Sequence, residues 1–377
     1  MKVRGRPLGG ICAALISVLA FGGCQNAVPS GGIPVSQSTP GGINGGNGGN
    51  SVNGANGQTA NPAEAGDITP ARPSQETQPS QIRFGAPRGA AALALTQFFM
   101  GDTGEGTFDG IPFSLELAGA PDQITAKLAT GELDAALLPV NLASVLYNRT
   151  DGDIRLAAIT GMGLFYAVAN NALRGDGPEL TEFAQLDGAK VVSFGLGATP
   201  QYVIEYLAQD NGIKLDITFT AEAPEAVAQL LAGQANFGIL PEPFVTSLLT
   251  QNPDFDVVVS LADAWEQATN SPLVTTALVF RADFLATYPQ TVHYLIAAVD
   301  SSISWVNAHP ADAAVIVAEQ MILPTAEIAE AAIPRTNLVM LTGAAARTAT
   351  LDFLTVLYQA NPVAIGGSIP DDDFFIE

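Results

Sequence analysis

Apolar residues after residue 81 fall alternately into short strand-like segments and longer helical ones. The expected strands of the first series are 82–85, 113–117, 134–138, 154–160 and 163–170, with helices at 90–100 and 121–130. A second series has strands at 190–194, 215–220, 236–240 and 256–260, with helices at 199–211, 224–233 and 243–251. This alternation predicts an α/β domain. A strand at 274–281 would return the chain to the first unit, and 289–360 reads as mostly helical.

The same order of elements occurs in both series, 102 residues apart. GELDAALLPVNLASVL begins at Gly131 and GQANFGILPEPFVTSLL begins at Gly233, which places Leu138-Pro139 over Leu240-Pro241. An Ala-Pro pair and an amphipathic segment precede each glycine. The repeated order helix, glycine, strand, Leu-Pro, helix predicts two similar α/β lobes facing each other. Carboxyl ends of strands and N-termini of helices would then line the cleft between them.

The first 24 residues have the features of an export signal. Lys2, Arg4 and Arg6 precede an apolar segment, 8–21, which is short for a membrane-spanning helix and typical of a signal peptide. The segment ends in Phe21-Gly22-Gly23-Cys24, which resembles a bacterial lipobox with Phe where Leu is usual. We expect 1–24 to be a lipoprotein signal peptide and Cys24 to carry lipid, which would anchor the chain without spanning the membrane. The alternative is an ordinary secretory signal with an incidental cysteine.

A segment of low complexity follows. Residues 25–80 contain 11 Gly, 7 Pro and 7 Asn and no aromatic residue. Such a composition cannot bury enough apolar surface to offset chain entropy. We therefore expect a disordered Gly/Asn/Pro-rich tether that ends where the folded domain, 81–377, begins.

Composition limits the classes of function. The chain has 377 residues, 47% of them hydrophobic, with 37 Asp and Glu against 15 Lys and Arg. The net charge of −22 argues against nucleic-acid binding and against a polybasic membrane-surface protein. Two Cys and two His argue against a disulfide scaffold, a Cys/His zinc site and a cysteine nucleophile. We expect no metal and no cofactor.

Segments across the whole domain carry a resemblance to a known family. They are 131–148, 185–207, 238–249, 302–314, 333–340 and 365–375. The chain resembles the substrate-binding lipoproteins of ABC importers, in the group associated with nitrate, sulfonate, taurine and thiamine-precursor uptake.

The resemblance implies the two-lobed type II periplasmic binding-protein fold, with lobe 1 at about 81–184 and 272–377 and lobe 2 at about 185–271. It implies a non-enzymatic, monomeric receptor that is lipid-anchored and faces the periplasm or cell exterior. A small molecule would bind in the cleft and pass to an ABC permease and ATPase. Few cations and several aromatic residues favour an organic ligand.

Two other functions stay open. One is a ligand-sensing module without transport. The other is a relative that uses pyridoxal phosphate to make a thiamine precursor, which requires a Schiff-base lysine. After the tether the lysines are Lys127, Lys190 and Lys214, and none falls in a predicted cleft loop.

The first candidate ligand-binding residues follow the first predicted strand of each series. Arg88-Gly89 lies where the first strand meets the first helix, although Arg88 could equally pair with a surface carboxylate. Gly197, Ala198 and Thr199 open a helix, with Thr199 as the expected N-cap. Free backbone N–H groups there would suit an anion or a carbonyl group.

The repeated Leu-Pro loops and several aromatic residues supply the rest. Asn141 and Glu242 occupy equivalent loops, and we expect Glu242 to meet Arg88 across the closed cleft. The residues Phe165, Tyr166 and Trp265 could form a wall for an organic ligand, or could belong to the core. Arg335 is interpreted as a salt-bridge residue, and His293 and His309 as structural.

Overall fold

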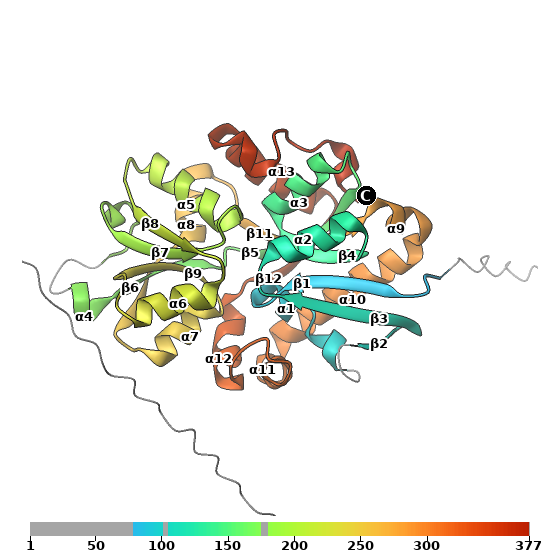
Figure 1. Cartoon of the computed structure of the whole chain (residues 1–377), viewed down its shortest axis with the longest axis horizontal. Coiled ribbons are helices and arrows are strands. Elements are labelled where there is room, and N and C mark those ends of the chain that lie inside the picture. Colours follow the sequence, from blue (N-terminus) through green and yellow to red (C-terminus); the bar gives the residue numbers. More distant parts are fainter. Residues whose placement is uncertain (1–77, 101–104, 175–179, 377) are drawn as a thin grey trace, which may run out of the picture. The chain divides into compact units, whose positions relative to one another are not determined.

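The computed structural model describes residues 78–100, 105–174 and 180–376 (Figure 1). The predicted signal peptide, Cys24 and nearly all of the predicted tether lie outside these residues.

Lobe 1 is built on a seven-stranded sheet in the order β12-β5-β11-β4-β1-β3-β2. Its strands are β1 (Ile82–Pro87), β2 (Glu105–Phe108), β3 (Ile111–Ala118), β4 (Ala135–Pro139), β5 (Ile154–Met162), β11 (Val274–Arg281) and β12 (Leu338–Thr342). β1 is parallel to β3 and β4, whereas β11 is antiparallel to both β4 and β5.

The helices of lobe 1 come from both ends of the domain. They are α1 (Ala90–Leu93), α2 (Pro121–Thr130), α3 (Val140–Arg149), α9 (Ala282–Thr287), α10 (Pro289–Ala308), α11 (Pro310–Glu319), α12 (Ala326–Ala332) and α13 (Gly343–Ala360). Short 3-10 turns are η1 (Thr96–Phe99), η3 (Ile333–Arg335), η4 (Pro362–Ile365) and η5 (Asp372–Phe374).

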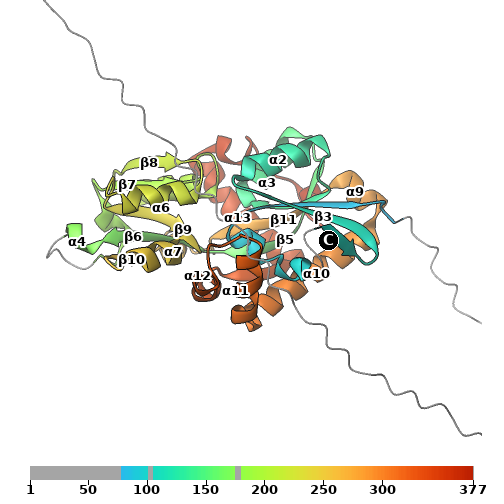
Figure 2. The same ribbon diagram turned by 60° about the horizontal axis from the view of Figure 1, so that its bottom comes forward.

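Lobe 2 is built on a five-stranded sheet in the order β10-β6-β9-β7-β8. Its strands are β6 (Phe165–Asn170), β7 (Lys190–Phe194), β8 (Asp216–Thr220), β9 (Phe237–Pro241) and β10 (Phe255–Ser260). Its helices are α4 (Asn171–Arg174), α5 (Thr199–Asp210), α6 (Ala223–Leu231), α7 (Phe244–Gln251) and α8 (Leu261–Thr269), with the 3-10 turn η2 (Phe183–Leu186). Figure 2 shows the two lobes side by side, with α12 of lobe 1 beside α7 of lobe 2.

The predicted repeat is present in both lobes. α2, β4 and α3 in lobe 1 correspond to α6, β9 and α7 in lobe 2, and both strands end in proline. Gly131 and Gly233 have φ of +75° and +69°, the left-handed conformation that ends a helix and favours glycine. The backbone N–H groups of the two glycines bond to Leu128 and Leu230 in the preceding helices.

The boundary between the lobes differs from the expectation near residue 185. β6 pairs with β9 and β10, so the chain enters lobe 2 after Gly163 and leaves it before Leu273. These two crossings are joined, because the Gly163 N–H donates to the Leu273 carbonyl at 2.9 Å. Gly163 has φ +53°, and a Cβ atom there would lie 2.7 Å from Ala262 Cβ. The crossing point therefore requires glycine.

One other local expectation is wrong, and another is confirmed with an exception. The predicted helix 90–100 is divided, since α1 ends at Leu93 and the chain continues as the 3-10 turn η1. The mostly helical region 289–360 contains a strand, β12, which pairs with β5 at the edge of the large sheet.

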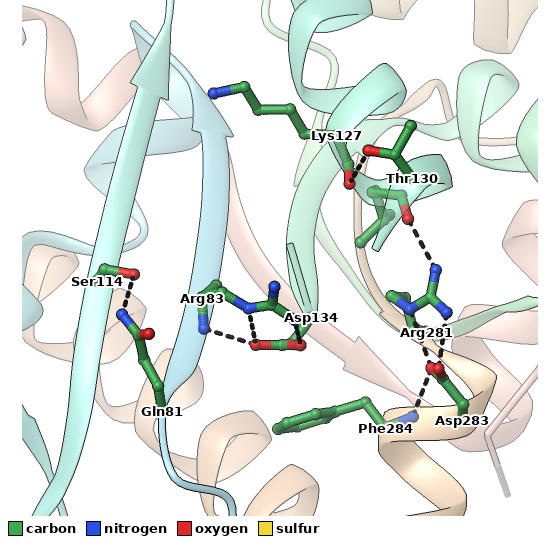
Figure 3. Close-up of polar contacts among 10 residues, drawn as sticks. Gln81, Arg83, Ser114, Lys127, Thr130, Asp134, Arg281, Asp283 and Phe284 are labelled. Atoms are coloured by element: carbon green, nitrogen blue, oxygen red, sulfur yellow. Dashed lines mark hydrogen bonds and ion pairs between the residues drawn. The ribbon is translucent and has the colours of Figure 1, made fainter. Parts of the chain in front are cut away.

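Ion pairs fix the ends of the lobe 1 strands that lie away from the cavity described below. Figure 3 shows Arg83 of β1 bonded to Asp134, which precedes β4, through Nε at 3.0 Å and through its backbone N–H at 2.8 Å. Arg281, at the end of β11, pairs with Asp283 at 2.7 Å and holds the pKa of that carboxyl below its usual value. Their position makes these pairs structural.

Candidate functional site

A cavity of about 420 Å³ lies between the lobes, at the carboxyl ends of the strands. Lobe 1 contributes Pro87 and Pro139 at the ends of β1 and β4, and lobe 2 contributes Phe194 and Pro241 at the ends of β7 and β9. The volume is in the range of small-molecule sites, about 300–1,000 Å³. The cleft predicted from the repeat is therefore present at the expected ends of the strands.

Arg88 and Gly89 form part of the lobe 1 wall. Arg88 is exposed, and its Nη1 donates to the Met321 carbonyl at 3.3 Å. Gly89 has φ +105°, and a Cβ atom there would lie 3.4 Å from Cε2 of Phe244 in lobe 2. The lobes thus approach each other closely at this point.

Asn141 links the lobes beside the cavity without lining it. This fully buried side chain donates through Nδ2 to the Ala364 carbonyl at 3.1 Å and to the Gly197 carbonyl at 3.3 Å. Its Oδ1 accepts a bond from Thr199 Oγ1 at 2.9 Å. Thr199 lines the cavity from lobe 2, whereas Gly197 does not.

The expected capping of α5 is wrong. Ala198 is the N-cap residue, and Thr199 is the first residue of the helix, so its hydroxyl is free to bond Asn141. The backbone N–H of Gly197 donates to Gln201 Oε1 at 2.7 Å. That of Ala198 donates to the Gly195 carbonyl at 3.0 Å. These two donors are thus already used within the loop.

Glu242 lines the cavity with no exposed surface. Its Oε1 lies 3.0 Å from Arg335 Nε, and its Oε2 accepts the Thr246 N–H at 3.1 Å. Burial raises the pKa of Glu242, although the positive charge of Arg335 and the Thr246 bond act in the opposite direction. The salt-bridge interpretation of Arg335 is confirmed, and the expected Arg88–Glu242 pair is absent.

Arg335 is held in place by a lobe 2 aromatic ring. It belongs to η3 in lobe 1, and its guanidinium lies 5.1 Å from the centre of the Tyr166 ring in β6. The Tyr166 hydroxyl donates to the Arg335 carbonyl at 3.3 Å. Tyr166 therefore supports the cross-lobe ion pair and does not itself line the cavity.

The aromatic residues divide between the cavity and the core. Phe165 lines the cavity, with its ring centre 6.0 Å from that of Phe194, and Phe244 lines it from α7. Trp265 is fully buried between Tyr206 and Phe353, so it belongs to the core and not to the binding wall.

Sequence reasoning missed three polar lining residues, Glu222, Thr275 and Thr276. Glu222, just before the Ala-Pro pair that opens α6, lies against lobe 1, since a Cβ atom at Gly119 would be 2.2 Å from its Oε1. Thr275 in β11 is 3% exposed, and its Oγ1 has no hydrogen-bond partner among the described residues. The repeated Ala-Pro pair could have indicated Glu222, whereas nothing in the sequence marks Thr275.

The remaining candidates lie away from the cavity. His293 and His309 are exposed on α10 and at its end, and no lysine of the described residues lines the cavity. Across residues 78–100, 105–174 and 180–376, no group of three or more acidic, His or Cys side chains could hold a metal ion. No helix within the described ranges is both long and apolar enough to cross a membrane.

Solved structures of low sequence identity share this fold. An ABC transporter protein from Parabacteroides distasonis matches 79% of this chain and 99% of its own, with 23% identity and a TM-score of 0.66. The alkanesulfonate-binding protein SsuA from Xanthomonas axonopodis pv. citri, bound to MOPS, matches 78% and 96%, with 13% identity and a TM-score of 0.60. The nitrate-binding protein NrtA from Synechocystis PCC 6803 matches 75% and 82%, with 14% identity and a TM-score of 0.57.

These similarities confirm the two-lobed periplasmic binding-protein fold. The three descriptions name transport or binding proteins, and none names an enzyme. A search of curated proteins finds no match. The family model that matches the chain spans residues 89–322. This range begins in lobe 1, includes all of lobe 2 and ends in lobe 1. The chain belongs to the NMT1-like family.

Proposed function

We propose that this protein is the extracytoplasmic solute-binding component of an ABC import system and binds a small organic molecule between its lobes. One observation carries the proposal: the cavity is made of residues from both lobes, and within the described ranges the chain crosses between the lobes twice, near Gly163 and before Leu273. A molecule in such a cavity contacts both lobes only when they are close together. It therefore stabilises the closed arrangement by its differential affinity.

Two polar contacts between the lobes would stabilise the closed state. Asn141 bonds Thr199 on one side, and Arg335 pairs with Glu242 on the other. These contacts would break when the lobes separate, and a permease would distinguish the two arrangements by shape. The description of the Parabacteroides distasonis relative as an ABC transporter supports delivery to such a transporter. Lipid on Cys24 would keep the receptor at the membrane.

The experiment that tests this proposal measures closure. Since the only two cysteines are Cys12 and Cys24, replacing both with Ser allows labels to be placed at will. Asp122 and Glu225 are exposed in the first turns of α2 and α6, beside the cavity. Spin labels at Asp122→Cys and Glu225→Cys should report a shorter distance when the molecule that co-purifies from the native host is added back.

A matched control places both labels in lobe 1. The pair Asp122→Cys and Asp300→Cys joins exposed positions on α2 and α10, and its distance should not change. If the cross-lobe distance is also unchanged at saturating ligand, the domain does not close and the receptor function is refuted. A ligand-sensing module would close in the same way, and only loss of uptake on deleting the gene separates the two.

A further inference from the structure

We propose that the cavity selects an uncharged, largely apolar organic molecule and excludes oxyanions such as sulfonates and nitrate. This inference rests on the proposed function and names the class of its ligand. It rests on three properties of the cavity wall: its few free hydrogen-bond donors, its charges and its apolar side chains.

Proline removes donors where an anion would need them. The N-terminal turn of a helix binds anions through backbone N–H groups that have no partner in the helix. Three helices that begin at the cavity have proline in that turn: Pro121 in α2, Pro200 in α5 and Pro224 in α6. Proline has no N–H group, so each helix offers one donor fewer.

Donors in the adjoining loops are bonded within the protein. The Glu242 N–H donates to the Leu164 carbonyl at 2.9 Å, and the Ala221 N–H donates to Glu225 Oε2 at 3.3 Å. The N–H groups of Gly197 and Ala198 are bonded as described above. An oxyanion would lose its hydration shell on entry and gain few bonds in exchange, which is unfavourable.

The charges of the cavity wall also oppose an anion. Arg88 is the only Arg or Lys among the lining residues in the described ranges, and it is exposed and bonded to the Met321 carbonyl. Two carboxylates, Glu222 and Glu242, line the same cavity, and Arg335 offsets only one of them. Residues 81–377 carry 34 Asp and Glu against 11 Lys and Arg, so the domain as a whole repels anions.

The remaining wall suits an apolar molecule with one polar group. Phe165, Phe194 and Phe244 supply aromatic faces. Thr275 supplies a buried hydroxyl whose Oγ1 has no partner among the described residues, and a buried polar group without a partner is costly. A hydroxyl or amide group on the ligand would satisfy it.

Two dyes of matched shape test the ligand class. N-phenyl-1-naphthylamine is neutral, and 8-anilinonaphthalene-1-sulfonate is the same skeleton with one sulfonate group; both fluoresce on entering an apolar site. Titrated into the full chain carrying Cys24→Ser, the neutral dye should bind one site at least about tenfold more tightly than the sulfonate. The reverse order would overturn the proposal, as would the absence of saturable binding by either dye.

Variants assign the signal to the cavity. Ala91→Trp fills the cavity from α1 and should abolish saturable binding of the neutral dye, whereas Ala345→Trp on the exposed first turn of α13 should not. Pro224→Ala restores an N–H group and should strengthen sulfonate binding severalfold relative to binding of the neutral dye. If the neutral dye binds the Ala91→Trp variant as tightly as the chain without that substitution, the dye does not bind in the cavity and its assignment to the cavity is refuted.

The two proposals fail in different ways. If the sulfonate binds more tightly and shortens the distance between labels at Asp122→Cys and Glu225→Cys, the ligand class is wrong and the receptor function stands. If the neutral dye fills the cavity without any change in that distance, the ligand class stands and closure fails.

Discussion

The ion pair between Glu242 and Arg335 should control closure, and Arg335→Gln tests this directly. Glu242 in lobe 2 is fully buried, whereas the Arg335 side chain in lobe 1 is 37% exposed. Glutamine keeps a polar side chain at position 335 but removes the charge. The Glu242 carboxylate is then buried without a cation in the closed arrangement.

The expected penalty follows from the burial of the two partners. Removing one partner of a buried ion pair costs about 3–5 kcal/mol. Because Arg335 is partly exposed, water can replace some of its interaction, and we expect about 2–3 kcal/mol. Lobe separation hydrates Glu242 and relieves this penalty. The variant should therefore favour the open arrangement and bind ligand about 30- to 150-fold more weakly, while each lobe stays folded.

The assay combines dye titration with the spin-label pair across the cleft. Arg335→Gln should lengthen the cross-lobe distance in the absence of ligand and weaken binding of the neutral dye. The double variant with Glu242→Gln should recover most of the lost affinity, because no charge is left buried. If Arg335→Gln closes and binds like the unmodified protein, the ion pair has no part in closure and the reasoning is refuted.

Four further predictions follow from individual residues. Burial raises the pKa of Glu242, so the closed state binds more protons than the open state between about pH 4.5 and that raised pKa. Affinity for the neutral dye should therefore fall as the pH rises through this window. The Glu242→Gln variant should not show this fall. Tyr166, whose pKa is raised above its usual value by burial, does not titrate in this window. Thr275→Val should leave stability unchanged or raise it by up to about 1 kcal/mol in urea unfolding, yet weaken ligand binding. Trp265→Ala should cost about 3–5 kcal/mol of unfolding free energy without moving the cavity residues, and equal stability would contradict its core position. Cys24→Ser should move the protein from the membrane fraction to the soluble fraction, and retention would argue against lipidation.

Local pattern predicted most elements of the fold, because strand and helix periods are properties of short segments. β7, α2 and β11 have the bounds expected from the sequence. β6 was placed in the wrong lobe, because its pairing with β9 and β10 depends on residues about 70 or more positions away. β12 was missed because it is a short edge strand inside a long helical region, stabilised by pairing with β5.

The cavity wall was predicted mainly at junctions where a strand ends and a helix begins. Arg88, Gly89, Phe165, Ala198, Thr199 and Glu242 all line the cavity, and their contact with ligand stays a prediction. The partner of Glu242 was wrong, because η3 reaches the cleft from nearly a hundred residues away and brings Arg335 nearer than Arg88. Trp265 was misplaced because an aromatic residue in a helix has the same pattern whether it faces a cleft or the core.

The order of strands in lobe 1 has a consequence for how the chain acquires its structure. All five strands of lobe 2 lie within 165–260, so this lobe is complete before β11 is reached. Lobe 1 begins earlier but cannot finish, since β11 lies between β4 and β5 and joins β5 to the rest of the sheet. Such long-range pairing is slow, because a large loop must close first. A chain ending at residue 273 should accordingly protect β7 and β9 from amide hydrogen exchange but leave β5 unprotected, so that the last hundred residues decide when the domain becomes two-lobed.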